Sequence, residues 1–456
     1  MEPDPPALSD WLGRAAGRRI ATAAGALALD DLVAAGSLGD ALGALAGASV
    51  VLMAGDPLKT AAALIDLDGR ARRIVLCPPE LEPRHLAAVI RDAEADALVH
   101  DGDAPPPAGT GLPLLAPCRL APTPRPAPAR RLATEWVLLT SGTTGDPKMV
   151  VHTLATLTGA IAPEEADAPV KQWATFYDIR RYGGLQILLR ALAGRGSLIL
   201  RAGGESIDDF LGRAGRAGVT HISGTPTHWR LVLMSAAARR IDPAYVRLSG
   251  EIADAALLDA LAALYPRARV AHAFASTEAG VAFEIGDGRP GFPASLLGAA
   301  GDGVALEIVD GALRIRSART ALRYLGAGAP ALRDADGFVD TGDMIAVSDG
   351  RCRFVGRRGG IINVGGAKVN PEEVEATINL HPRVRASLVS GRRNPITGAV
   401  VAADVVLADG AVAEPALERE ILALCAARLA PHKAPALIRF VPALAVTAGG
   451  KLARHG

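Results

Sequence analysis

The sequence predicts an α/β protein with a large N-terminal domain and a small α+β C-terminal domain. Two observations support this prediction. Short apolar strands alternate with helical patterns over two long stretches, which indicates two βα-layered subdomains around largely parallel sheets. From about residue 301 the pattern changes to short strands joined by turns, which indicates a small β-rich subdomain. A chain of 456 residues is also too long for one ordinary core.

The first stretch covers residues 1 to about 100. Its second helix has apolar residues at helical spacing and a proline suited to the first turn. A segment rich in Pro, Gly and Ala, at about 102–130, is then typical of a linker. The elements expected before that linker are a strand at 48–53, a helix at 58–67, a strand at 73–77, a helix at 83–95 and a strand at 97–100.

The second stretch runs from residue 134 to about 300, and the β-rich and C-terminal parts follow it. We place the domain boundary at 356/357, so that residues 1–356 form the N-terminal domain and 357–456 the C-terminal domain. The expected strands lie at 136–139, 198–200, 219–223, 269–274, 305–309, 313–316 and 352–355, and the expected helices at 207–217, 255–264, 371–380 and 415–429.

Composition excludes several classes of protein. The 49 basic and 48 acidic residues nearly cancel, so no basic field is available for a nucleic acid. Four scattered cysteines form no CxxC pair, which argues against a zinc or redox motif and favours reduced thiols. The longest apolar run, at 42–54, is too short to span a bilayer, and the acidic, proline-rich start is unlike a signal peptide. We therefore expect a soluble, cytoplasmic protein without membrane insertion.

Residues 138–148 contain the most informative loop of the chain. Few ligands other than a polyphosphate need so many backbone N–H groups, hydroxyls and one cation within so few residues. The spacing is not that of a Walker A loop, and a plain Gly/Thr turn between two strands is the alternative. The candidate phosphate-binding residues are Thr140, Ser141, Gly142, Thr143, Thr144, Gly145 and Lys148.

This loop resembles the phosphate-binding signature of the AMP-forming adenylating enzymes, which include acyl- and aryl-CoA synthetases, peptide-synthetase adenylation domains and firefly-type luciferases. Four further strings follow in the order of that family, and several motifs in order carry less risk of a false match than one. The resemblance covers residues 134 to 451. It implies ATP, Mg²⁺ and either CoA or a phosphopantetheine thiol as cofactors.

Two of these strings supply nucleotide ligands if the resemblance holds. For the string 273–280, the resemblance implies that Thr277 contacts the α-phosphate, that Glu278 binds Mg²⁺ and that Phe274 stacks on adenine. For the string 336–343, the resemblance implies that the carboxylate of Asp343 binds both ribose hydroxyls. Arg357 matches the arginine of the family's Gly-Arg pair, which implies that it contacts the ribose or a phosphate at the domain border. Taken alone, both strings are ordinary turns.

Two more strings belong to the C-terminal part. The glycine loop at 361–366 implies that Gly365 and Gly366 line a tunnel for the thiol arm. The string at 447–451 ends on Lys451. The resemblance implies that this lysine bridges the substrate carboxylate and the α-phosphate during adenylation. A lone lysine near a chain end is otherwise usually solvated.

The chain departs from the family at two places. The resemblance implies that the small C-terminal domain is mobile, and Gly359 stands where the family has an Asp or Lys as the hinge of that domain. In the acid-pocket segment, Asp178, Arg180 and Arg181 replace the usual Phe-His or Phe-Asp pair, and an arginine there favours a second anionic or polar group on the substrate. The alternative is an Arg–Asp pair that braces the loop. Trp229, as an aromatic wall or a core residue, and Gly250 complete the expected pocket.

The sequence therefore predicts an AMP-forming acid–thiol ligase. A carboxylate attacks the α-phosphorus of Mg-ATP, with Lys148 on the β/γ-phosphates and Lys451 on the developing charge, and a thiol then attacks the acyl-AMP. The expected partners are a small carboxylic acid, ATP, and CoA or an acyl carrier protein, with a homodimer as a further expectation. The alternatives are an acyl-AMP ligase that loads a carrier protein or an amine, and a non-catalytic adenylate or acyl binder.

Overall fold

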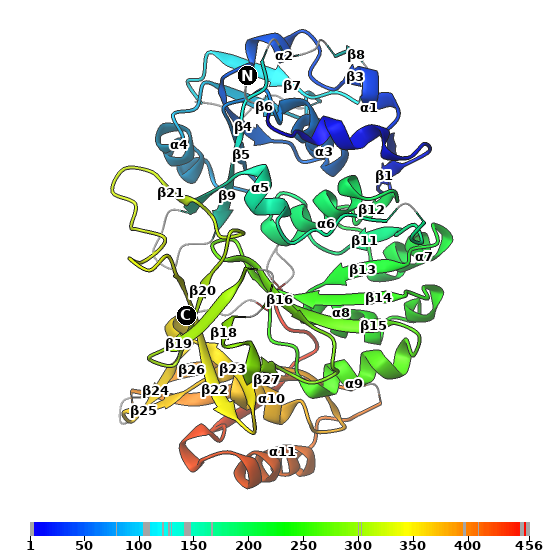
Figure 1. Cartoon of the computed structure of the whole chain (residues 1–456). Coiled ribbons are helices and arrows are strands. Elements are labelled where there is room, and N and C mark those ends of the chain that lie inside the picture. Colours follow the sequence, from blue (N-terminus) through cyan, green and yellow to red (C-terminus); the bar gives the residue numbers. More distant parts are fainter. Residues whose placement is uncertain are drawn as a thin grey trace.

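The computed structural model of the chain consists of two large mixed sheets, a β-rich subdomain and a C-terminal α+β unit (Figure 1). The expected fold class is thereby confirmed. The structure describes residues 4–78, 80–103, 110–120, 123–125, 128, 130–140, 147–165, 167–299, 301, 303–394, 398–408, 410–446 and 451–452.

The first large sheet contains seven strands within the described residues, in the order β21-β10-β9-β5-β4-β6-β7. Its central strands pair in parallel, and helices α3 (Pro57–Leu67) and α4 (Pro83–Asp92) connect them, as the strand–helix alternation predicted. Apolar side chains of β4 and β5 have almost no exposure, because both faces of this sheet are covered. The strands are β4 (Ser49–Met53), β5 (Arg73–Leu76), β6 (Ala97–His100), β7 (Leu114–Pro117), β9 (Glu135–Thr140), β10 (Lys148–His152) and β21 (Arg323–Leu325).

The second large sheet has eight described strands, in the order β16-β15-β14-β13-β11-β12-β1-β2. It recruits β1 and β2 from the start of the chain, so the two sheets do not follow two consecutive sequence blocks. Its strands are β1 (Arg19–Ala21), β2 (Ala26–Ala28), β11 (Trp173–Thr175), β12 (Leu198–Leu200), β13 (His221–Gly224), β14 (Tyr245–Ser249), β15 (Arg269–Ser276) and β16 (Gly280–Ile285). Its helices are α6 (Tyr182–Ala193), α7 (Ile207–Arg216), α8 (Pro226–Met234) and α9 (Ala255–Leu264).

The β-rich subdomain is a six-stranded antiparallel sheet in the described part of the chain, in the order β17-β23-β22-β20-β19-β18. It has its own core around Phe292, Leu306 and Ile315. The strands are β17 (Phe292–Pro293), β18 (Gly298–Ala299), β19 (Ala305–Val309), β20 (Ala312–Arg316), β22 (Val339–Ser348) and β23 (Arg351–Arg357).

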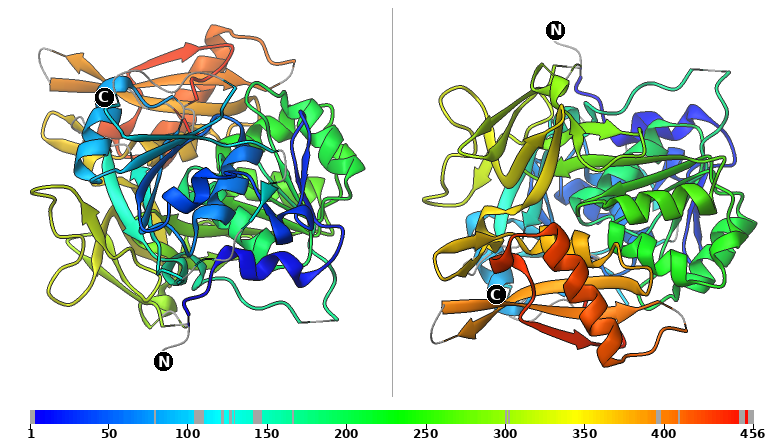
Figure 2. Two further views of the ribbon diagram at one scale, coloured as in Figure 1. Left: turned by 90° about the horizontal axis from the view of Figure 1, so that it is seen from above. Right: turned by 90° about the horizontal axis from the view of Figure 1, so that it is seen from below.

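The C-terminal unit has a separate core that begins at Ile362 and includes Val405 and Ile421. It lies to one side of the N-terminal sheets in both views of Figure 2, where it is coloured orange to red. A 3-10 turn at Arg358–Gly360 joins it to β23. Its elements are β24 (Ile362–Val364), β25 (Ala367–Val369), α10 (Pro371–Ile378), β26 (Val384–Asn394), β27 (Gly398–Leu407), α11 (Pro415–Arg428) and β28 (Leu437–Phe440).

The segment at 102–130 is not a plain linker. Its described part contains β7, which extends the first sheet, and β8 (Thr123–Pro124), which pairs with β3 (Ala35–Gly36). Composition favoured a linker because proline-rich edge strands look like loops in sequence. The remaining short helices are α1 (Asp31–Ala34), α2 (Ala41–Ala44), α5 (Leu154–Thr158) and 3-10 turns at Leu8–Arg14, Ala238–Arg240, Ala294–Leu296 and Pro431–Lys433.

Two sequence expectations about the interior can be compared with the structure. All four cysteines are buried, and burial raises the pKa of each thiol; the pKa is raised to about 12 at Cys77 and Cys118 and to about 11 at Cys425. Within the described residues, no helix is both long enough and apolar enough to cross a bilayer.

Candidate active site

The hairpin of β9 and β10 presents the candidate phosphate loop. Thr140, the last residue of β9, pairs with Lys148, the first residue of β10. The Lys148 ammonium lies 5.2 Å from the ring centroid of Tyr324 on β21, and the Tyr324 hydroxyl lies 3.5 Å from Oε1 of Glu278. The lysine and the candidate metal ligand are therefore connected through one tyrosine. The loop residues Ser141, Gly142, Thr143, Thr144 and Gly145 lie outside the described residues.

His152 connects this hairpin to the turn that carries Thr277 and Glu278. Nε2 of His152 donates to the carbonyl of Thr277 at 2.7 Å, and Nδ1 lies 2.9 Å from the Thr156 hydroxyl. Burial lowers the pKa of His152 to about 4, so the ring is neutral at pH 7. Two of the strings recognised in the sequence are thus held together by one buried imidazole.

Asp343 and Arg357 face each other across β22 and β23. Nε of Arg357 lies 3.1 Å from Oδ1 of Asp343, and Nη2 donates to the Thr341 carbonyl at 2.8 Å. Burial raises the pKa of Asp343, and the charges of Arg357 and then Lys451 oppose that rise. The Asp343 side chain retains 19% exposure, so its carboxylate remains available to a ligand.

Lys451 reaches the N-terminal part of the molecule. A Cβ placed on Gly250 would lie 3.2 Å from Cε and 3.6 Å from Nζ of this lysine, and Gly250 has a φ of +90° that other residues rarely adopt. Desolvation lowers the pKa of Lys451, and Glu251 and Asp343 oppose that shift, although the residue retains access to solvent. The structure therefore brings together Lys451, Gly250 and Asp343, which stand far apart in the sequence.

Glu251 anchors the segment that carries Lys451. Its Oε1 accepts from the backbone N–H of Leu452 at 2.9 Å and from the Thr227 hydroxyl at 3.0 Å. Its Oε2 accepts from the backbone N–H of Thr227 at 2.9 Å. The sequence marked Glu251 only as part of a pocket segment, because a contact between residues 201 positions apart leaves no local pattern. Tyr324 was missed for the same reason.

The two arginines of the acid-pocket segment have different surroundings. Arg180 pairs with Asp178 at 2.8 Å, and its Nη1 donates to the carbonyls of Ala54 and Gly55 at 2.7 and 3.0 Å, so it braces the loop. Arg181 pairs with Glu80 at 2.7 Å and is close enough to Lys451 to lower the pKa of that lysine. Of the two, Arg181 is therefore the one whose charge reaches the site.

Three further candidates are placed as follows. Trp229 is fully buried, and its indole N–H donates to the Arg247 carbonyl at 3.2 Å, so it belongs to the core of the second sheet. Phe274 stacks on Phe354 at 5.3 Å between ring centroids, with 4° between the ring planes. Gly365 and Gly366 form the turn between β24 and β25, at the edge of the C-terminal unit in Figure 1.

The site contains groups that suit a magnesium nucleotide. Among the described residues, no group of three or more His, Cys, Asp or Glu side chains gathers as a metal site. Mg²⁺ usually takes one or two carboxylates and completes its shell with phosphate oxygens and water, so the single carboxylate of Glu278 near Lys148 fits that ion.

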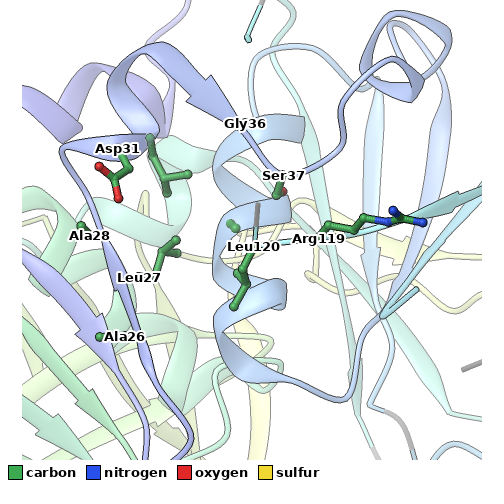
Figure 3. Close-up of a pocket in the computed structure, with 10 residues that line it drawn as sticks. Ala26, Leu27, Ala28, Asp31, Gly36, Ser37, Arg119 and Leu120 are labelled. Carbon is green, nitrogen blue, oxygen red and sulfur yellow. The ribbon is translucent and has the colours of Figure 1, made fainter. Parts of the chain in front are cut away.

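A separate cavity of about 120 Å³ lies in the N-terminal part of the chain. It lies between the β2–α1 segment, the Gly36–Ser37 turn and α3, and Figure 3 shows Arg119 pointing away from Leu27 and Leu120. None of the candidate site residues lines this cavity.

Family comparison identifies the chain. Residues 27–319 match the family described as AMP-binding enzyme, and residues 373–451 match its C-terminal domain. The chain therefore belongs to the AMP-binding enzyme family, the AMP-forming adenylating enzymes that its motifs resemble.

Individual relatives agree with this assignment. The chain is 30% identical over 258 residues to a 2-succinylbenzoate–CoA ligase from Salmonella typhimurium, a match that covers 55% of this chain and 53% of the relative. It is 29% identical over 281 residues to the acyl-CoA ligase ppsA from Aspergillus oryzae, covering 55% of this chain and 49% of the relative. These matches span about half the length of these curated relatives.

Solved structures share the fold over nearly the whole chain. The anthranilate CoA ligase AuaEII in complex with anthranoyl-AMP gives a TM-score of 0.83 at 22% identity, covering 99% of this chain and 96% of that chain. A benzoate CoA ligase from Burkholderia xenovorans gives 0.80 at 21% identity, covering 98% and 99%. The amide bond synthetase McbA from Marinactinospora thermotolerans gives 0.75 at 21% identity, covering 98% and 97%.

Proposed function

We propose that the protein activates a small carboxylic acid with ATP, releases pyrophosphate, and transfers the acyl group from acyl-AMP to the thiol of CoA. The position of Lys451 beside Gly250 and near Asp343 is the observation that carries this proposal. An ammonium there neutralises charge that develops between the carboxylate and the α-phosphate. No side-chain nucleophile is needed, because a carboxylate is already ionised at pH 7.

The remaining residues would bind and orient the nucleotide. Lys148 and the loop before it would hold the β- and γ-phosphates, Thr277 the α-phosphate, and Asp343 the ribose hydroxyls, with Arg357 beside them. Phe274, whose ring packs against Phe283 and Phe354, would contact adenine. Mg²⁺ on Glu278 would supply charge neutralisation for the leaving pyrophosphate. This division leaves positioning and electrostatics as the main contributions of the protein.

The second step requires Lys451 to leave. In this proposal the C-terminal unit, with its boundary at residue 357, rotates about the Arg358–Gly360 turn, and Gly365 and Gly366 then line the path of the thiol. Gly359 and Gly360 supply backbone freedom at that turn. One ion pair, from Arg358 Nη1 to Asp340 Oδ2 at 2.8 Å, crosses it at the surface.

ATP–pyrophosphate exchange over a panel of aryl, alkyl, dicarboxylic and amino acids tests the first step. We expect exchange with at least one acid. Supplying CoA, a phosphopantetheinylated carrier protein or an amine to the active combination then identifies the acceptor, and CoA thioester formation supports the proposal. An absence of exchange with every acid, while ATP still binds, would instead support the non-catalytic binder.

A further inference from the structure

Arg247 is a buried guanidinium without a full set of partners. It lies in the middle of β14 with 3% exposure, and its Nε lies 3.4 Å from Oε2 of Glu284. Its Nη2 is inaccessible to solvent and makes no hydrogen bond within the described part of the chain. Burying an unpaired guanidinium N–H is costly, so a group that pairs with it only in the complex would stabilise that complex.

Positive charge exceeds negative charge around Arg247. The same Glu284 also pairs with Arg269 at 3.0 Å and accepts from the Tyr245 hydroxyl at 2.5 Å. Arg190 lies close by, and burial together with the charge of Arg247 lowers its pKa to about 10. Two guanidiniums therefore pair with one carboxylate while a third lies within reach of their charge, and this region favours a second anion.

Arg247 lies two residues before the end of β14, the strand that leads to Gly250 beside Lys451. Side chains alternate along β14, so Arg247 and Ser249 are on the same face. Gly250 follows three residues after Arg247, which is ~10 Å along an extended strand. Tyr177 is close to both ends of this stretch: its hydroxyl donates to the Ser249 carbonyl at 2.7 Å, and the charge of Arg247 opposes the rise that burial causes in its pKa.

The neighbouring strands place small side chains on the same face. Ser223 of β13 and Ala271 of β15 flank Arg247, and Ala273 of β15 flanks Ser249. Large side chains at these positions would keep an acyl group off the face of β14 that Arg247 and Ser249 share. Small ones fit a short or planar acyl group that lies along β14.

We propose that Arg247 binds the far end of the acid, and that the substrate is a small dicarboxylic acid. One carboxylate lies at Gly250 and Lys451 and reacts, while the second accepts a charge-assisted hydrogen bond from Nη2 of Arg247. This inference rests on the proposed function, because it needs the acid to be activated at Lys451. It names the substrate class that the proposed function leaves open.

Matched acids test this assignment in pyrophosphate exchange: benzoate against isophthalate and terephthalate, and pentanoate against glutarate. We expect at least one diacid to exceed its monoacid in kcat/KM by about 10- to 100-fold. In Arg247→Met, the KM of that diacid rises and the KM of the monoacid falls. Arg269→Met is the matched control, because it removes a guanidinium from the same Glu284 at the rim, where Arg269 is 60% exposed. It should retain the preference for the diacid.

Four results would overturn the assignment. A wild-type protein that prefers the monoacids refutes it while leaving the proposed function intact, and so does an Arg247→Met variant that binds ATP but loses exchange with both acids in equal proportion. If Arg247→Met does not fold, Arg247→Gln replaces it, and an unchanged KM for the diacid in that variant also refutes the assignment. Exchange with no acid overturns the proposed function and this inference together.

Discussion

Two lysines of the candidate site are held in opposite ways. Lys148 begins β10, a strand that pairs with β9 on one side and β21 on the other. Lys451 precedes Leu452, which forms an isolated bridge with Val446 and donates its backbone N–H to Glu251, and neither residue belongs to one of the described sheets. We infer that Lys148 belongs to a fixed half of the site and Lys451 to a removable half. A lysine outside the sheets can leave the site without breaking any strand pairing, whereas a lysine within a paired strand cannot.

The largest expected effect is on the removable half. Lys451→Ala should lower pyrophosphate exchange by about 10²- to 10³-fold, because it removes a charge aimed at the developing negative charge. ATP binding should persist, and so should thioester formation from supplied acyl-AMP. Lys433→Ala is the control, since that lysine pairs with Glu373 within the C-terminal unit. Unchanged exchange in Lys451→Ala would contradict the role of this lysine.

The fixed half can be tested through His152. Its pKa of about 4 in the folded state lies below the ordinary value of 6.5, so the unfolded chain binds more protons between these pH values. The contribution of neutral His152 to the free energy of unfolding is therefore complete above pH 6.5 and is lost as the pH falls toward 4. When the pH is lowered from 7.5 to 5, the free energy of unfolding measured with urea should fall by about 2 kcal/mol more in the wild type than in His152→Gln. Equal losses in both proteins would show that His152 does not hold the hairpin in a neutral form.

The smallest expected effect concerns the hydrogen bond between Glu251 and the backbone N–H of Leu452. Glu251→Ala should lower pyrophosphate exchange by about 5- to 10-fold, because it removes the acceptor for the Leu452 N–H. Thioester formation from supplied acyl-AMP should change little, since Lys451 has left by then. Thr227→Val removes a hydroxyl from the same carboxylate without touching Leu452, and should retain normal exchange. A similar loss in pyrophosphate exchange and in thioester formation would mean that Glu251 supports the fold as a whole rather than the position of Lys451.

Local patterns predicted individual elements better than their arrangement. The helix expected at 58–67 is α3 (Pro57–Leu67), and the strand expected at 73–77 is β5 (Arg73–Leu76), because apolar spacing and proline position act within a few residues. The pairing of β1 with β12 was not predicted. Strand partners are chosen by contacts between distant segments, which leave no periodic pattern.

The same limit applies to the site. Asp343 and Lys451 were found because each stands in a short string, yet the sequence alone could not choose between Arg180 and Arg181. That choice depends on carbonyls at Ala54 and Gly55, which directly follow β4 of the first sheet. Arg247 belongs to no string, and its only signal is a charge inside an otherwise buried strand.

The buried cysteines make the chain convenient for optical measurements. The thiolate is the form that reacts with thiol-reactive dyes, and four inaccessible thiols with raised pKa values leave little background labelling. A fluorescent donor and acceptor on two added surface cysteines, one on α9 and one on α11, would then label selectively without removal of the natural residues. Single-molecule energy transfer on such a pair could follow the orientation of the C-terminal unit turnover by turnover.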